Sequence, residues 1–279
     1  YFCFLKAMKS LTKKHFHAYR VSPLCMFSYP RLQHYAQMLE TFLTAEVKCA
    51  GDPTTNSGFH TNISVFPGLA TGQRDPEAIL IQIFCKQEQK RPAWEGLLCS
   101  VEPEPSYLTV CMPFVLLPLL LVHGPKKFTT AWKTWFERTF DCCVSPLVIP
   151  SYELAWMAAL WAGAMSVPRT LDLQWSSPPP VSDGLHITMS VNRNDALRLW
   201  DCVHTSGEEE VGLFKQGLEE HIFHHFHVIL DAMILESVSS GVASANNSGH
   251  IKVLFHKPLV HILVASSYLL DILIPTKGS

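Results

Sequence analysis

Three short apolar runs decide the fold class of this chain: FHTNISVF at residues 59–66, AILIQIFCK at 78–86 and EGLLCSVE at 95–102. Each run has the length of a β-strand and is bounded by turn-forming residues. Glycine, proline and charged residues lie between the runs, where they favour a reversal of the chain. We therefore predict three successive strands that pair as an antiparallel meander.

Helical periodicity appears on both sides of the predicted meander. Apolar residues recur at helical spacing from about Pro30 to Val47, and proline suits the first turn of a helix. A second helix is predicted over 126–142, and a third, apolar nearly all round, from about Ser151. The aromatic residues that the second helix places along one broad face are Phe128, Trp132, Trp135, Phe136 and Phe140. That face is too apolar to remain in water.

The last hundred residues repeat this mixture of strands and helices. LHITMSV at 185–191 alternates as a strand, and Asn192 or Asn194 can cap the helix that follows. A further helix begins at the acidic residues 208–210, and the residues predicted on its buried face are Val211, Phe214, Leu218, Ile222 and Phe226. From Val228 the pattern becomes strand-like. NNSG at 246–249 predicts a hairpin turn, because Asn and Gly tolerate positive φ.

These elements predict an α+β chain with a mainly antiparallel sheet and helices packed on one face. The proline-rich stretch 171–184 is the best candidate for a seam, which we place near residue 180. We therefore expect an N-terminal part over 1–180 and a C-terminal part over 181–279, packed as one body. No repeat at a fixed period is visible, which argues against solenoids and propellers.

Composition narrows the function classes. Of the 279 residues, 48% are hydrophobic and 16% are charged, which excludes a disordered chain and leaves more apolar surface than a monomer usually carries. We expect an obligate partner for that reason. A formal net charge of −2 gives no global attraction to nucleic acid, so any contact with DNA must come from a local patch. Nine cysteines without a CxxC pair are typical of a reducing compartment.

Several blocks, in one order along the chain, resemble the centromere protein L family. They are PLCMFSYPRLQHYAQMLETFLTAE at 23–46, GQRDPEA at 72–78, TWFERTFDCCVSPL at 134–147, HIFHHFH at 221–227 and SVSSGVASANNSGHIKVLFHKPLVHIL at 237–263. The resemblance implies a curved, half-saddle sheet and a non-enzymatic structural subunit of the inner kinetochore, located in the nucleus at the centromere. It implies no cofactor.

The resemblance also implies partners. Centromere protein N is the expected partner in a heterodimer that forms a DNA-holding saddle, with centromere protein C, the H-I-K-M group and the centromeric nucleosome as further contacts. The sequence itself adds a hairpin and adjoining strand at 228–256 that could augment a partner's sheet. The candidate interface residues are Val228, Leu230, Ala232, Ile234, Ile251, Val253 and Phe255.

Basic residues form two candidate contacts for the DNA backbone. Phosphates need only cationic donors, and the family resemblance raises this interpretation above ordinary solvated charge. The first group lies on or near the aromatic helix, and the second lies in the basic N-terminal run. The candidates are Lys126, Lys127, Lys133 and Arg138 in the first group, and Lys13 and Lys14 in the second.

The alternative function is a metal- or thiol-dependent enzyme that uses the His221–His227 cluster. His221 and His225 have the i,i+4 spacing of metal ligands, but the Glu of an HExxH motif is missing, so packing along the helix flank is favoured. Cys142 and Cys143 are likewise interpreted as packing. Motifs of the main hydrolases, dinucleotide-binding proteins and P-loop proteins are absent from the sequence. We predict no catalytic, cofactor or metal residue.

A peripheral membrane protein is a third hypothesis. The apolar run at 108–122 is shorter than the roughly 20 residues that span a bilayer, and Pro113 and Pro118 interrupt it. We interpret it as buried strand and turn, and expect no membrane partner.

Overall fold

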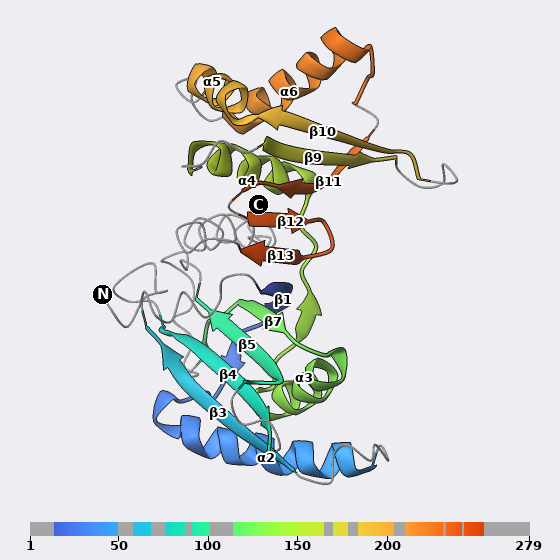
Figure 1. The fold of residues 1–279 in the computed structure, drawn as a ribbon. Helices are drawn as coiled ribbons and strands as arrows, with labels where there is room; N and C mark the ends of the chain where they lie inside the picture. Colours follow the sequence, from blue (N-terminus) through green and yellow to red (C-terminus); the bar gives the residue numbers. More distant parts are fainter. Residues whose placement is uncertain are drawn as a thin grey trace, which may run out of the picture. The chain divides into compact units, whose positions relative to one another are not determined.

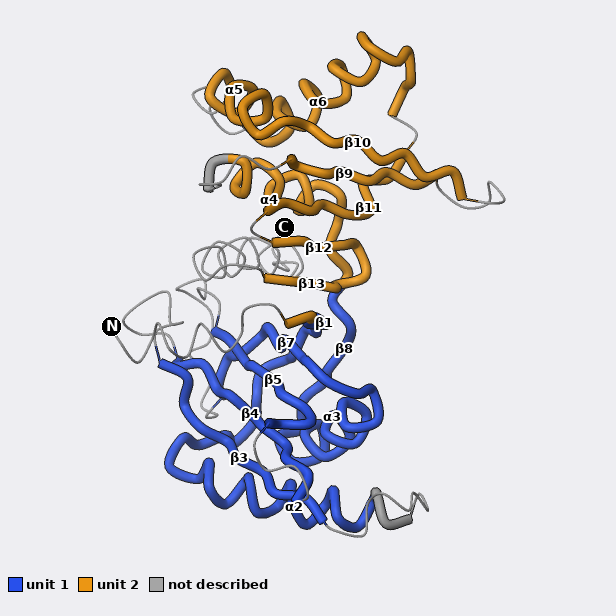
Figure 2. The backbone as a smooth tube through the Cα atoms, in the orientation of Figure 1, with its two compact units in different colours: residues 1–7, 16–147, 270–279 blue, residues 8–15, 148–269 orange. Residues whose placement is uncertain are grey.

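The computed structural model of the protein describes residues 14–49, 58–67, 76–86, 91–100, 114–164, 170–177, 184–203, 210–230, 233–241 and 243–253. Over these residues the fold is α+β, with five α-helices and thirteen strands, and the antiparallel pairing of the strands does not close into a barrel (Figure 1). The predicted fold class is confirmed. The described residues divide into two compact units, the first within 16–147 and the second within 148–253 together with 14–15 (Figure 2). The seam predicted near residue 180 falls on 178–183, outside the described residues, and stays a prediction.

The sheet of the first unit contains the predicted meander. Its strands, in the order in which they pair, are β1 (His15–Val21), β7 (Leu119–His123), β5 (Trp94–Cys99), β4 (Ala78–Cys85) and β3 (Phe59–Phe66), with β8 (Val144–Pro146) also on β1. Ile81 in β4 stands opposite Ile63 in β3 and Gly96 in β5, which fixes the register. A separate two-stranded ladder joins β2 (Leu24–Cys25) to β6 (Phe114–Val115). The antiparallel meander is confirmed.

Two helices cover one face of this sheet. A 3-10 turn, η1 (Tyr29–Arg31), leads into α2 (Leu32–Cys49), and α3 (Lys126–Phe140) follows β7. All five aromatic residues predicted on the buried face of α3 are buried, and the rings of Trp132 and Phe136 stack with centroids 4.4 Å apart. The helix ends because Asp141 adopts a left-handed conformation with φ 46°.

The apolar run at 108–122 is only partly described. Its last four residues belong to β7, and all four are buried. Residues 108–113 lie outside the described residues. No helix in the part of the chain that the structure describes has the length and apolarity needed to cross a membrane.

The second unit has its own five strands. They are β10 (His186–Asn192), β9 (Thr170–Ser176), β11 (Ile234–Ser239), β12 (Ala243–Asn246) and β13 (His250–Val253), in the order in which they pair. The NNSG turn joins β12 to β13 as predicted, with Gly249 at φ +75°. The strand predicted from Val228 begins only at Ile234.

Three helices pack in this unit: α4 (Ser151–Ala164), α5 (Arg193–Val203) and α6 (Glu210–Phe226). The Asn192 side chain accepts a hydrogen bond from the backbone N–H of Asn194 at 3.0 Å, so it caps α5 as predicted. The prediction that Phe226 lies on the buried face of α6 is wrong, because its side chain is 68% exposed. At 100° per residue Phe226 lies about 60° from Val211, at the margin of the apolar stripe.

Candidate partner and nucleic-acid interfaces

Strands at the end of a sheet carry backbone groups that a strand of another protein can pair with. Strands β11 and β12 each have a neighbour on both sides, so adding a partner's strand to either one would break an existing pair. Among the described strands, β10 lies at one end of the order of pairing within the second unit, and β3 lies at one end of the order within the first unit. These two strands are therefore the candidates for addition of a partner's strand.

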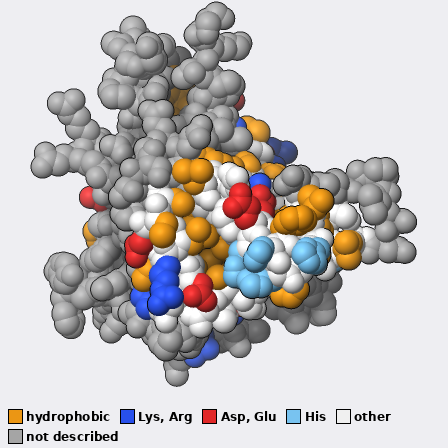
Figure 3. Space-filling model, turned by 90° about the horizontal axis from the view of Figure 1, so that it is seen from above, with side chains coloured by type: hydrophobic (Ala, Val, Ile, Leu, Met, Phe, Trp, Pro, Cys, Tyr) orange, Lys and Arg blue, Asp and Glu red, His pale blue; other side chains and the backbone are white. Residues whose placement is uncertain are grey.

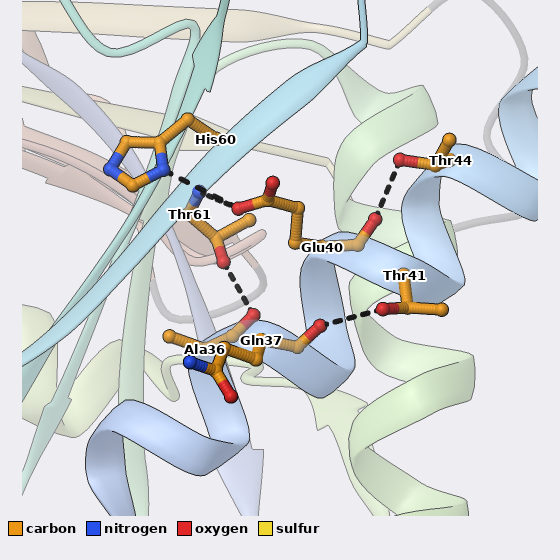
Figure 4. A network of polar contacts seen from close by, with 7 residues as sticks. All are labelled: Ala36, Gln37, Glu40, Thr41, Thr44, His60 and Thr61. Atoms are coloured by element: carbon orange, nitrogen blue, oxygen red, sulfur yellow. Dashed lines mark hydrogen bonds and ion pairs between the residues drawn. The ribbon is translucent and has the colours of Figure 1, made fainter.

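Helix α2 supplies a hydrogen-bond acceptor to β3 (Figure 4). The backbone N–H of Thr61 donates to the Glu40 carboxylate at 3.3 Å, and the Thr61 hydroxyl donates to the Ala36 carbonyl at 2.6 Å. His60 Nδ1 lies 3.4 Å from the same carboxylate oxygen of Glu40. A partner's strand at this position would compete with Glu40 for the N–H of Thr61, so α2 makes β3 the less available end strand.

Strand β10 pairs with β9 along its whole length and presents a polar face. His186, Thr188 and Ser190 are exposed and stand opposite Ser176, Gln174 and Asp172 of β9. His186 Nδ1 lies 3.3 Å from Glu236 Oε2 and 3.4 Å from Gln174 Nε2. Among the described strands, β9 is the one that pairs with β10.

The predicted partner-interface residues fall into three groups. Leu230, Ile251 and Val253 are buried, at 2%, 2% and 1% exposure. Val228 is half-buried, and Ile234 is 41% exposed and stands opposite Ser176 of β9. Ala232 and Phe255 lie outside the described residues. A charge at Leu230 or Val253 would disturb the core, so Ile234 is the better position at which to test an interface.

Two of the predicted DNA-contacting lysines lie at the N-terminus of α3. Lys126 and Lys127 are exposed, Pro125 at the N-cap offers no side-chain hydrogen bond, and the first turn has no acidic residue. A helix N-terminus carries partial positive charge from its unpaired N–H groups. Two lysines there raise a positive potential that is unfavourable for the helix and attractive to a phosphate.

The other predicted basic residues differ in their surroundings. Lys133 Nζ lies 3.8 Å from Glu137 Oε1, which partly offsets its charge, whereas Arg138 is exposed in the last turn of α3. Lys14 is half-buried beside the start of β1, and Lys13 lies outside the described residues. Four of the six predicted residues therefore lie on one helix: Lys126 and Lys127 at its start, Lys133 in its middle and Arg138 in its last turn.

The histidine cluster lies at the C-terminal end of α6. His221, His224, His225 and His227 are all exposed, and His227 ends the helix with φ 55° while its N–H donates to the Phe223 carbonyl at 2.9 Å. Histidine side chains gather beside hydrophobic ones on the face shown in Figure 3. Among the described residues, no group of three or more His, Cys, Asp or Glu side chains is arranged to hold a metal ion.

The adjacent cysteines do not have the environment of a reactive thiol pair. Burial, and after it the nearby Glu137 carboxylate, raises the pKa of the Cys142 thiol to about 12. A nucleophilic cysteine needs the opposite shift, because the thiolate is the reactive form. Cys143 is exposed, and its backbone N–H donates to the Ser22 hydroxyl at 2.9 Å.

No pattern in the sequence indicates the buried carboxyl group in α4. Glu153 is 1% exposed, and neither of its carboxyl oxygens has a hydrogen-bond partner among the described residues. Burial raises the pKa of this carboxyl to about 7. A single Glu in the first turn of a helix usually faces solvent, so only the packing of α4 identifies it.

Comparison with known proteins agrees with the resemblance seen in the sequence. A family model described as centromere protein L matches residues 10–268. The chain is 38% identical over 268 residues to centromere protein L of Rattus norvegicus and to that of Homo sapiens, covering 91% of this chain and 77% of each relative. It is 35% identical over 270 residues to centromere protein L of Gallus gallus, covering 92% of this chain and 78% of that relative. The chain belongs to the centromere protein L family.

Proposed function

We propose that this protein is a non-enzymatic structural subunit of the inner kinetochore, located at the centromere in the nucleus. Its family supports the centromeric role, since the relatives are named for the centromere. In this proposal the chain pairs with centromere protein N, and the pair forms a saddle that holds DNA and supports attachment of centromere protein C and the H-I-K-M group.

One observation carries the choice of surface for the pairing. Strand β3 of the first unit and β10 of the second differ in what lies beside them: Glu40 of α2 accepts the N–H of Thr61 in β3, whereas β10 has β9 as its neighbour and exposed polar side chains. We therefore place the partner's strand along β10. Ile234 stands opposite Ser176 of β9, and Ser176 stands opposite His186 of β10. Ile234 therefore lies in the same cross-strand row as His186, where a partner bound along β10 can contact it.

Lysine on an end strand is a natural obstacle to strand addition, which supplies the test. The chain is co-expressed with the C-terminal half of centromere protein N, and the complex is measured by size-exclusion chromatography with light scattering. Thr188→Lys with Ser190→Lys alters β10. The matched control, Asn62→Lys with Ser64→Lys, makes the same change on β3. Circular dichroism of each variant reports whether the chain is folded.

The proposal expects a one-to-one complex for the natural chain and for the β3 variant, and loss of the complex for the folded β10 variant. Ile234→Asp should weaken the complex without abolishing it. Loss of the complex only in the β3 variant would move the interface to the first unit and refute the choice of β10. A folded natural chain that forms no complex with centromere protein N would refute the pairing itself.

The proposed DNA contact rests on the N-terminus of α3. Lys126→Ala with Lys127→Ala removes two exposed charges, and Lys14→Ala removes one from the second predicted group. In a salt titration of binding to duplex DNA, each lost phosphate contact lowers the slope of log K against log salt by about 0.9. We expect the double variant of the complex to lose about two such contacts. An unchanged slope would exclude α3 from the DNA contact.

A further inference from the structure

Two histidines on α6 have the spacing and separation of a metal chelate. His221 and His225 are four residues apart on one helix, and their ring centroids are 4.5 Å apart. Side chains at i and i+4 lie one above the other on the same face. Both histidines are exposed, so an ion in solution can reach them without a change in the fold.

The separation of the rings matches what a shared ion requires. A Zn–N bond of about 2.0–2.1 Å places each ring centroid about 3.2 Å from the metal, so two imidazoles on one ion have centroids about 4.5 Å apart for an N–metal–N angle of about 90° and about 5.2 Å apart for the tetrahedral angle. The rings of His221 and His225 lie at the lower end of that range. The helix therefore holds the two ligands close to the required position before an ion binds, which reduces the entropy lost on binding.

The other histidines of the cluster are less well placed. The ring of His224 lies 5.6 Å from that of His225, and adjacent residues on a helix point in different directions. His227 lies beyond the end of the helix with a left-handed backbone, and the centroid of its ring lies 6.0 Å from that of the Phe223 ring. Among the ring contacts within the cluster, His221 and His225 have the shortest separation, which makes them the best candidates for a shared ion.

We propose that His221 and His225 chelate one divalent transition-metal ion, with water in the remaining coordination positions. Imidazole is a good ligand for Zn²⁺, Cu²⁺ and Ni²⁺, and the order of affinities for such sites places Cu²⁺ first. Two protein ligands leave positions open, so the site is distinct from a closed structural zinc site with four ligands. The open positions can accept a ligand from a second molecule.

The test is a calorimetric titration of chelator-treated, untagged protein with ZnCl2 and with CuCl2. The decisive variant exchanges two neighbours, His225→Phe with Phe226→His, which keeps the number of histidines and breaks the i,i+4 spacing. His34→Ala is the matched control, since His34 is a single exposed histidine on α2. Circular dichroism confirms that α6 is intact in both variants.

The expected result is one ion per chain, with CuCl2 bound more tightly than ZnCl2 and with affinity reduced at least tenfold by the exchange but unchanged by His34→Ala. The apparent melting temperature should rise with added ZnCl2 in the natural chain and not in the exchanged variant, because a ligand of the folded state stabilises it. Equal affinity of the natural and exchanged chains would overturn the proposal. Binding lost equally in His34→Ala would also overturn it.

Discussion

The indole Nε1 of Trp94 donates a hydrogen bond of 2.9 Å to the hydroxyl of Thr129. Trp94 belongs to β5 and Thr129 to the first turns of α3, and both side chains are buried. The bond satisfies a polar group inside an otherwise aromatic core, where the rings of Trp94 and Trp132 are 5.6 Å apart. It therefore fixes the position of the helix against the sheet of the first unit.

Replacing Thr129 by Val should destabilise the protein by about 1–3 kcal/mol, because the Trp94 N–H would remain buried without an acceptor. Val has nearly the shape of Thr, so the change isolates the hydrogen bond. Urea unfolding followed by tryptophan fluorescence measures the difference in the free energy of unfolding. Thr129→Ser is the control, and it should retain most of the stability, since its hydroxyl remains. Equal losses in both variants would show that packing, not the hydrogen bond, dominates.

Gly124 lies where a side chain cannot fit. Its φ is +129°, and a Cβ would lie 2.8 Å from the carbonyl oxygen of Ala93 and 2.9 Å from the Cα of Trp94. Gly124→Ala should therefore lower the free energy of unfolding by roughly 1–3 kcal/mol, through backbone strain and displacement of β5.

Gly212 in α6 provides the contrast, because a Cβ there meets nothing within 4 Å. Gly212→Ala should raise stability by roughly 0.5–1 kcal/mol, and thermal unfolding measures both changes.

Glu153 should make the stability of the protein depend on pH. Burial raises the pKa of its carboxyl from 4.5 to about 7. The folded state therefore retains a proton that the unfolded state loses, and stability falls as pH rises from about 4.5 to about 7. The size of this effect is about 3 kcal/mol. Urea unfolding at pH 5 and pH 8 measures it.

Glu153→Gln should remove this part of the pH dependence, because glutamine stays neutral. The variant should be more stable than the natural chain at pH 8 and nearly equal to it at pH 5. Glu46→Gln is the matched control, since Glu46 is exposed on α2. A natural chain whose stability stays constant between the two pH values, relative to Glu153→Gln, would contradict the prediction.

Lys126 and Lys127 should oppose the stability of α3. Replacing both by Glu places negative charge at the positive end of the helix dipole, where each favourable charge contributes about 0.3–1 kcal/mol at low salt. We expect a more stable chain that binds DNA less well in the complex with centromere protein N. Thermal unfolding at low and high salt measures the first effect, and the gain should shrink as salt screens it. A loss of stability would show that the lysines have an unrecognised structural role.

Local patterns were enough to predict most elements. The aromatic stripe of α3, the meander of β3, β4 and β5, and the NNSG turn each depend on residues within a few positions of one another. Phe226 shows the limit of such patterns, because a residue at the margin of a stripe is buried only where another element covers it. Similarity of residue blocks along the chain was likewise enough to predict the family.

The sequence by itself thus determined the fold class, the helices and their buried faces, and the family, because periodicity and turn residues act over short distances. The tertiary structure alone decided which strands lie at the end of the sheet, and it placed β11 and β12 inside the order and β10 at its end. It also decided that Glu153 is buried and that Glu40 meets the backbone of Thr61. These features depend on which distant segments pack together, and no local pattern specifies that.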